Sequence, residues 1–200
     1  MSVKPFDTRY FERYARLSLV WAGGAEFSAL RCADLPDLQA PDRTLGVEVT
    51  RAMLQSRQEA RTFSDEIAGR LSGYDLRWLE RLRRGAGPHC DSTDPYAEVL
   101  AAIRKKVDRL ESGDYDGFDR YGLYVFSAGD LSRAEALRAA AALGRMQRGL
   151  PRRYGALYLN QVQRMYFCTP DPPRCRTCAI PPETQERLHQ AALDPACGQG

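Results

Sequence analysis

The sequence predicts an α/β domain in which helices flank a central mixed sheet. Segments with helical periodicity alternate with segments of strand composition, which is the order typical of α/β domains. The segment RYGLYVFSA at residues 120–128 contains a continuous apolar run, as expected for a central strand that is buried on both faces. The chain has 200 residues, of which 44% are hydrophobic, so it is long enough for one domain with a substantial core.

The predicted helices are marked by their first residues. Asp7 and Asp94 are suitable N-caps, and Pro95 stands at a first helical position. The sequences SRQE and SRAE, at 56–59 and 132–135, are capping boxes. Five segments have helical character, and they cover residues 7–19, 56–71, 74–85, 94–113 and 132–147.

The predicted strands lie at residues 45–50, at 120–128, and in the segment YGALYLNQVQRMYFC, which reads as two strands around a tight turn. After residue 169 the chain has five prolines before position 183, which is typical of an appended tail. The sequence therefore predicts a domain over residues 1–168, with a helical insertion at about 51–118, and a C-terminal tail over 169–200.

Two carboxylates, Asp37 and Glu48, lie on the two arms of a predicted hairpin. The turn-rich sequence APDRT separates them, and a return of the chain there brings them close together. Val47 and Val49 share one face of the second strand, so Glu48 points to the opposite face. Two carboxylates held close together repel each other unless a cation or a proton lies between them. The alternative is that Asp37 is a turn residue and that Glu48 faces solvent.

The composition indicates a soluble globular protein. The formal net charge of +3 is too small to imply a nucleic-acid partner by itself. No apolar run approaches the length of a membrane span, and the first residues lack the order of basic, apolar and small-residue regions found in a signal peptide. We therefore expect a cytoplasmic protein that does not bind membranes.

Cysteines are concentrated near the C-terminus, where the segment CTPDPPRCRTC contains a C-x-x-C pair. This pair suits a zinc site better than a redox helix, because its surroundings are rich in proline. A structural Zn²⁺ site in the tail would use four thiolates, those of Cys168, Cys175, Cys178 and Cys197. The alternative is a set of reduced thiols. His89 and His189 lack partners at catalytic spacing and are expected at the surface.

The hairpin PDLQ…LGVEVT, the later segment IRKKVDRL, the strand after it and the segment YGALYL resemble the PD-(D/E)XK nuclease superfamily. More narrowly, they are similar to bacterial and phage proteins with a PD…GIEVT signature. The resemblance covers about residues 7–168. It implies a restriction-endonuclease-like core, with a central mixed sheet flanked by helices, that holds one or two divalent metal ions.

The resemblance also implies roles for single residues. Asp37 and Glu48 would be catalytic metal ligands, with the backbone carbonyl of Val49 as a third ligand, and Glu12 would match an additional helix glutamate of the family. The expected ion is Mg²⁺ or Mn²⁺, because hard cations prefer oxygen ligands and activate water for phosphodiester hydrolysis.

The chain departs from the family pattern at the catalytic lysine. The family has a lysine two residues after the glutamate, where this chain has Thr50. Lys4, Lys105 and Lys106 are the only lysines, against 26 arginines. We select Lys106 as the substitute, because it heads the segment KVDRL, which resembles the family's lysine-containing helix. The alternative is that Lys105 and Lys106 are solvated helix residues.

A basic stripe of Arg77, Arg81 and Arg84 at helical spacing is suited to phosphate contacts, although such stripes are more often solvated faces. The predicted function is a metal-dependent nuclease that acts on DNA or RNA, in a phage, defence or mobile-element setting. The alternative is a catalytically inactive nuclease-like fold that binds nucleic acid or protein and carries a zinc-binding tail. The oligomeric state stays open, a homodimer included.

Overall fold

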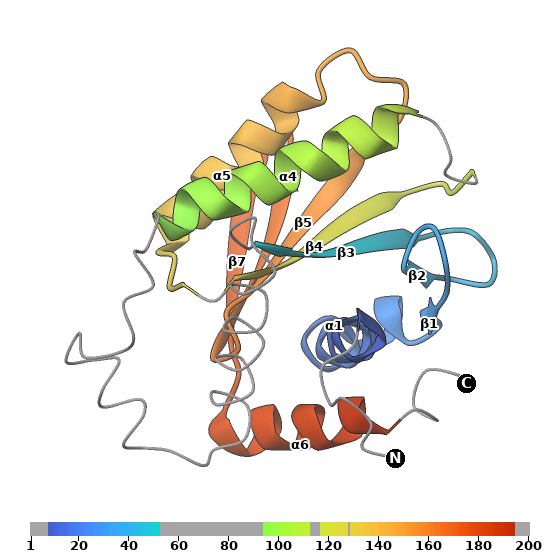
Figure 1. Ribbon diagram of the computed structural model, residues 1–200, viewed down its shortest axis with the longest axis vertical. Coiled ribbons are helices and arrows are strands. Elements are labelled where there is room, and N and C mark those ends of the chain that lie inside the picture. Colours follow the sequence, from blue (N-terminus) through green and yellow to red (C-terminus); the bar gives the residue numbers. More distant parts are fainter. Residues whose placement is uncertain (1–7, 53–93, 113–116, 128, 195–200) are drawn as a thin grey trace.

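The computed structural model describes residues 8–52, 94–112, 117–127 and 129–194. A seven-stranded sheet lies between two helices on each face, in three layers (Figure 1). The strands are β1 (Arg31–Cys32), β2 (Leu38–Gln39), β3 (Gly46–Ala52), β4 (Tyr121–Ser127), β5 (Tyr154–Asn160), β6 (Arg164–Pro170) and β7 (Pro173–Ala179). The helices are α1 (Thr8–Gly23), the 3₁₀ helix η1 (Gly24–Phe27), α4 (Pro95–Ser112), α5 (Arg133–Met146) and α6 (Pro182–Leu193).

The strands follow their sequence order across the sheet, from β1 to β7. The three central strands β3, β4 and β5 are parallel, whereas β1–β2–β3 and β5–β6–β7 are antiparallel. All seven residues of β4 are buried, because α4 and α5 cover one face of the sheet and α1 and α6 cover the other. The predicted α/β class, the mixed sheet and the buried central strand are therefore confirmed.

Alternation along β3 divides its side chains between two cores. Val47 and Val49 pack with α1, in a core that contains Phe11 and Tyr14. Ala52 points to the opposite face and joins the core that α4 and α5 form over the sheet. The period of two that the sequence shows in β3 thus sets which side of the sheet each residue faces.

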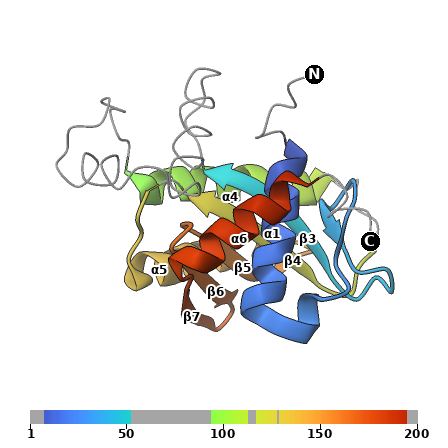
Figure 2. The ribbon, with the colours of Figure 1, turned by 90° about the horizontal axis from the view of Figure 1, so that it is seen from below.

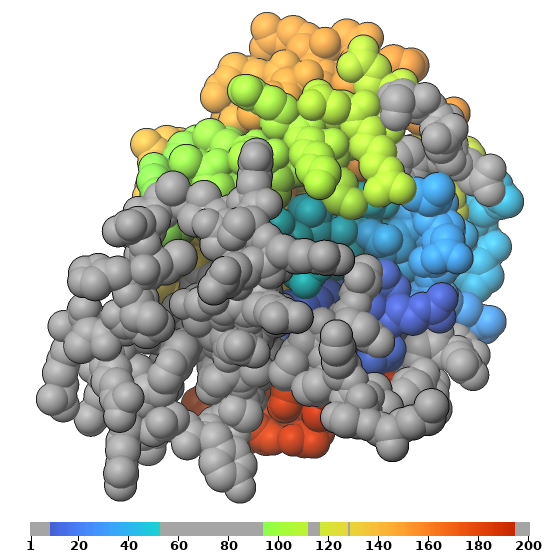
Figure 3. Space-filling view, viewed as in Figure 1, coloured from blue at the N-terminus to red at the C-terminus, as the bar shows by residue number. Residues whose placement is uncertain are grey.

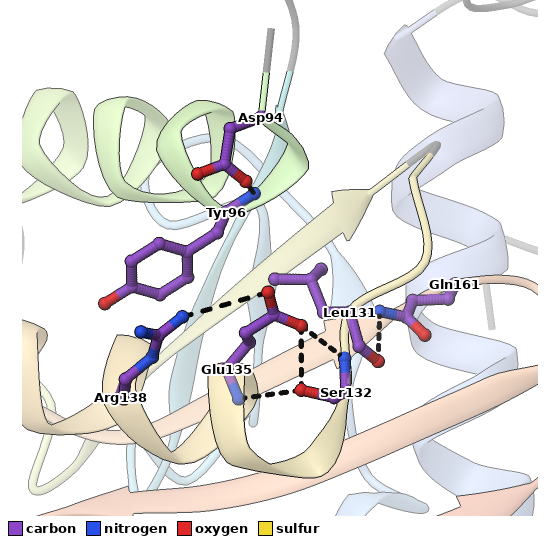
Figure 4. A network of polar contacts seen from close by, with 7 residues as sticks. All are labelled: Asp94, Tyr96, Leu131, Ser132, Glu135, Arg138 and Gln161. Atoms are coloured by element: carbon purple, nitrogen blue, oxygen red, sulfur yellow. Dashed lines mark hydrogen bonds and ion pairs between the residues drawn. The ribbon is translucent and has the colours of Figure 1, made fainter. Parts of the chain in front are cut away.

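The starts of α4 and α5 follow the predicted capping signals. Asp94 accepts a hydrogen bond from the backbone N–H of Tyr96 at 2.9 Å. Ser132 and Glu135 form a complete capping box, in which each side chain bonds the other's backbone N–H. Figure 4 shows these contacts, with Arg138 reaching Glu135 on the same face of α5. Local signals are sufficient here because the cap needs only neighbouring residues.

The segment predicted as a tail instead belongs to the domain. β7 pairs with β6 along its whole length, and α6 packs against α1 (Figure 2). The prolines stand at the ends of these elements, at Pro170, Pro173 and Pro182, and a proline is tolerated at a strand end and in a first helical turn. The tail prediction is therefore wrong for the described residues as far as 194.

The contact between α1 and α6 also corrects the placement of His189. Its imidazole is only 5% exposed, and its Nδ1 lies 2.9 Å from the hydroxyl oxygen of Tyr10. Arg13 of α1 donates from Nε to the carbonyl oxygen of Ala192 at 2.6 Å. His189 is thus a buried polar residue of the helix interface and not a surface residue.

Most of the predicted helical insertion, together with the capping box at 56–59, the helix at 74–85 and His89, lies outside the described residues. Within the predicted limits of 51–118 the structure describes the end of β3 and the whole of α4. None of the helices in the described ranges combines the length and the apolar character that a membrane span requires.

Candidate active site

The β2–β3 hairpin brings Asp37 beside the middle of β3. Leu38 pairs with Val47 and Gln39 pairs with Gly46 in antiparallel register. Asp37 comes directly before β2, and its Oδ2 accepts a hydrogen bond from the backbone N–H of Val49 at 2.7 Å. The predicted return of the chain is therefore present, and it places the aspartate against the strand that carries Glu48.

Gly46 allows this close approach. A Cβ at position 46 would lie 2.6 Å from the Cγ of Pro36 and 3.1 Å from the ring of Phe118. The first distance is shorter than real Cβ contacts allow, so the Pro36–Asp37 segment can reach β3 only because residue 46 has no side chain. The glycine in the sequence LGVEVT thus has a direct part in positioning Asp37.

Glu48 points into the layer between the sheet and α4. It is 1% exposed and lies beside Leu123 of β4, which belongs to the core beneath α4 and α5. The alternative that Glu48 faces solvent is therefore wrong. A buried carboxylate requires a compensating charge, because removal from water strongly disfavours the ionised form.

Lys106 of α4 supplies this charge. Its Nζ lies 2.5 Å from Oε1 of Glu48, and the lysine side chain is 12% exposed. Lys105, the neighbouring residue, is exposed, because adjacent helix residues point about 100° apart. The structure thus brings Lys106 and not Lys105 to the buried carboxylate, and the alternative of a fully solvated Lys106 is wrong.

The guanidinium of Arg109 forms a second positive contact, with its Nη1 3.8 Å from Oε1 of Glu48. Arg109 follows Lys106 by three residues, so both lie on the same face of α4. Its side chain is 51% exposed and reaches the site from the solvent side. Arg109 is not among the site residues that the sequence predicts, although its spacing of three residues from Lys106 is a signal that points to it.

The residues after Glu48 are divided between the two faces of the sheet. Thr50 lies on the same face as Glu48, and Arg51 points to the other face. There the guanidinium of Arg51 lies 4.7 Å from the centre of the Phe11 ring. Arg51 therefore does not supply a cation to the carboxylates.

The electrostatics of the two carboxylates are coupled. The pKa of Asp37 is raised to about 6, first by burial and then by the nearby charge of Glu48. The hydrogen bond from Val49 and the charges of Lys106 and Arg109 lower the same pKa, but do not compensate for the burial. Asp37 therefore lies close enough to Glu48 for repulsion, in a position where an added cation favours its ionised form.

The oxygen atoms of this site suit a hard divalent cation. Among the described residues, Oε2 of Glu48 is buried and has no hydrogen-bond partner. The N–H of Val49 points toward Asp37, and the carbonyl of the same strand residue lies on the same side of β3. Two carboxylates and one backbone carbonyl form a donor set that fits Mg²⁺ or Mn²⁺ with water in the remaining positions.

A larger metal cluster is not found in the described ranges. They contain no group of three or more His, Cys, Asp or Glu side chains arranged to hold a metal ion. The candidate site therefore depends on two carboxylates, and its role in metal binding stays a prediction.

Glu12 lies in α1, on the other side of the sheet from α4, and is half-buried. Arg16, one turn later on the same helix, donates from Nε to the carbonyl oxygen of Leu30. This contact holds that turn of α1 beside Leu30, directly before β1. A catalytic part for Glu12 stays a prediction.

The cysteines of the proposed zinc site are separated by the strand geometry. Cys168 and Cys175 pair directly across β6 and β7 and belong to the core under α5. Cys178 is three residues after Cys175 in β7, so it faces the opposite core. Cys175 and Cys178 therefore do not face a common ion, and Cys197 lies outside the described residues.

The basic stripe of Arg77, Arg81 and Arg84 also lies outside the described residues. Figure 3 shows atoms of the β3 region, coloured teal, at the surface between α4 in green and the blue N-terminal segment. Part of the β3 region therefore reaches the molecular surface beside α4.

Comparison with models of protein families, with curated protein sequences and with solved structures finds no match for the chain.

Proposed function

We propose that this protein is a metal-dependent nuclease that hydrolyses phosphodiester bonds in DNA or RNA. One observation carries the proposal: Asp37 and Glu48 come together at the β2–β3 hairpin, and Lys106 of α4 contacts the same buried carboxylate. The resemblance of PD…GVEVT to the PD-(D/E)XK superfamily supports this function. Hydrolysis of a phosphodiester needs an oxygen-ligated cation, an oriented water molecule and positive charge near the phosphoryl oxygens.

The roles follow from the positions of the groups. Asp37, Glu48 and the carbonyl of Val49 would hold Mg²⁺ or Mn²⁺. The bound ion would polarise a phosphoryl oxygen and lower the pKa of a ligated water molecule. Lys106, held beside Glu48, orients the attacking water and stabilises negative charge that develops on the phosphoryl group. Arg109, which is half-exposed, binds the phosphate that enters from solvent.

Lys106 on α4 would take the role of the lysine that is expected at position 50, where this chain has Thr50. What the chemistry requires is the position of the ammonium group, and this does not depend on the element that carries it. In this chain the donor lies 58 residues after Glu48, yet its Nζ is in hydrogen-bond contact with the carboxylate.

Cleavage assays with matched variants test the proposal. The full chain is incubated with single- and double-stranded DNA and RNA, with Mg²⁺, with Mn²⁺ and with a chelator. The wild type is expected to cleave at least one substrate only when the metal is present. Lys106→Met is expected to slow cleavage by about 10²–10⁴-fold, and the exposed Lys105→Met serves as the control with wild-type activity.

Two outcomes would contradict the proposal. Equal activity of both lysine variants would remove Lys106 from the mechanism. Nucleic-acid binding without cleavage by a metal-loaded wild type would instead favour a binding module built on a nuclease-like fold. Circular dichroism of each variant verifies that a loss of activity is not a loss of folding.

A further inference from the structure

Cys168 and Cys175 form a close thiol pair on the two strands of the last hairpin. They are direct partners in the antiparallel register of β6 and β7, and their Sγ atoms are 2.9 Å apart. Directly opposed residues of antiparallel strands have Cα atoms about 4.5–5.5 Å apart. This separation falls within the range that a disulfide spans, so a bond between the two sulfur atoms requires no rearrangement of the strands.

The surroundings of the pair make the two thiols unequal. Cys168 is 2% exposed, and its Sγ lies 3.9 Å from the carbonyl oxygen of Ala136 in α5. Cys175 is 8% exposed and lies on β7, the edge strand of the sheet. Cys168 therefore faces the interior of the α5 layer, and Cys175 is the thiol nearer to solvent.

Electrostatics favour Cys175 as the thiolate. The hydrogen bond from the Cys168 thiol lowers the pKa of Cys175, burial raises it, and the charge of Arg133 lowers it. The guanidinium of Arg133 lies close to this residue, since its Nε and Nη2 donate to the carbonyl oxygen of Cys175 at 3.3 and 3.1 Å. The same hydrogen bond, together with burial, raises the pKa of Cys168. A thiolate beside a thiol is the arrangement that reactive cysteine pairs use.

We propose that Cys168 and Cys175 are an oxidative modification site, at which a peroxide converts the two thiols into a cross-strand disulfide. The direct pairing and the sulfur contact carry this inference, and it does not depend on the proposed nuclease activity. Cys178 takes no part, because it lies on the opposite face of β7.

The reaction proceeds in two balanced steps. The Cys175 thiolate attacks one oxygen of hydrogen peroxide, the O–O bond breaks, and the hydroxide that leaves takes a proton to become water. The sulfur of Cys168 then attacks the sulfenic sulfur of Cys175, the S–O bond breaks, and a second water molecule leaves with the Cys168 proton. Both thiols are oxidised by one electron each, and the peroxide is reduced by two electrons.

Peptide mapping tests the site directly, because trypsin separates all three cysteines. Cleavage after Arg164, Arg174 and Arg176 places Cys168 in MYFCTPDPPR, Cys175 in the dipeptide CR and Cys178 in TCAIPPETQER. The reduced full chain is treated with hydrogen peroxide, the remaining thiols are blocked with N-ethylmaleimide, and the digest is examined by mass spectrometry. The expected product is MYFCTPDPPR linked to CR, with Cys178 blocked by the reagent.

Matched variants separate the pair from its neighbour. Cys178→Ser is expected to form the same linked peptides at the same rate as the wild type. Cys168→Ser is expected to lose the link and to accumulate a sulfenic acid on Cys175 that reacts with dimedone. The proposal is overturned if, after peroxide treatment of the wild type, Cys168 and Cys175 are both still free thiols and are both found as N-ethylmaleimide adducts. It is also overturned if either residue is linked to another cysteine, or if Cys175 reaches the sulfinic acid while Cys168 stays a thiol.

Discussion

At the scale of single residues, Glu48 carries a carboxylate that is 1% exposed, and Lys106 supplies the charge that compensates for its burial. A buried ion pair contributes little net stability, but the removal of one partner leaves the other charge without compensation. The same geometry that suits catalysis therefore makes the lysine a structural residue in the metal-free protein. Activity alone does not separate these two roles, so stability has to be measured as well.

The first prediction is that Lys106→Met destabilises the metal-free protein by about 3–5 kcal/mol, as expected when a buried carboxylate loses its partner. The double variant Glu48→Gln, Lys106→Met serves as the control. It should lose less stability than Lys106→Met, because no charge of the pair remains buried. Mg²⁺ should restore part of the lost stability in Lys106→Met and none in the double variant. Chemical denaturation measures the stability of the wild type and of both variants. Equal losses of stability in the two variants, without metal, would contradict the role assigned to the pair of Glu48 and Lys106.

The second prediction concerns Asp37. Because its pKa is raised from 3.8 to about 6, the folded state holds the proton more tightly than the unfolded state. Stability of the metal-free protein is therefore lost as pH rises between these two values and stays lower above them. Asp37→Asn, which is always neutral, should be more stable than the wild type at about pH 8, by at most about 3 kcal/mol.

The same comparison contains its own control. Well below the unfolded pKa of 3.8 the wild-type carboxyl is protonated in both states, so the advantage of Asp37→Asn should disappear. The asparagine should also abolish the stabilisation that Mg²⁺ gives the wild type. A difference in stability that does not change with pH would show that Asp37 is not the titrating group.

At the scale of elements, the β2–β3 hairpin positions the site, and it depends on Gly46. The third prediction is that Gly46→Ala displaces Pro36, because the new Cβ would lie 2.6 Å from its Cγ. We expect a loss of stability of about 1–3 kcal/mol and a weaker affinity for Mn²⁺ by calorimetry.

Gly155→Ala in β5 is the matched control for this change. A Cβ at position 155 meets only the carbonyl oxygen of Tyr121, at the ordinary distance of 3.9 Å. It should leave both the stability and the Mn²⁺ affinity close to those of the wild type. Equal effects of the two alanines would mean that the close approach of Pro36 is not what holds Asp37 in place.

The elements that the sequence predicted well are those with local signals. The capping residues Asp94 and Ser132 mark the starts of α4 and α5, because caps involve only residues of the same turn. β4 was recognised by its apolar run, which is unusual outside a strand buried on both faces. In each case the physical cause lies within a few residues of the element.

β7 and α6 are not among the elements that the sequence predicts, and the reasons differ. β7 pairs with β6, the strand directly before it, so its partner is local; the prolines that predict an appended tail instead mark the start of β7 and the start of α6. α6 packs against α1 at the other end of the sequence, and nothing near His189 indicates that Tyr10 will cover it. The contact between α1 and α6 is therefore a part of the fold that local sequence does not contain.

At the scale of the whole molecule, the candidate site combines residues of the β2–β3 hairpin with residues of α4. Asp37 and Glu48 were selected from the sequence because a hairpin holds them a short distance apart. The scarcity of lysine points to Lys105 and Lys106, and the segment KVDRL favours Lys106. Only the packing of α4 on β3 brings its Nζ to Glu48, which lies 58 residues earlier in the chain. Arg109 is not predicted, although it follows Lys106 by three residues, because its contact with Glu48 becomes evident only once α4 is docked on β3.

Asp37 and Glu48 are proposed to share a divalent cation, and crystals soaked in Mn²⁺ test this most directly. We expect an anomalous difference peak about 2.0–2.2 Å from oxygen atoms of both carboxylates, adjacent to the carbonyl of Val49. The peak should be absent in crystals of Asp37→Asn treated in the same way. A wild-type crystal in which manganese binds elsewhere, while the two carboxylates keep only their protein contacts, would contradict the account.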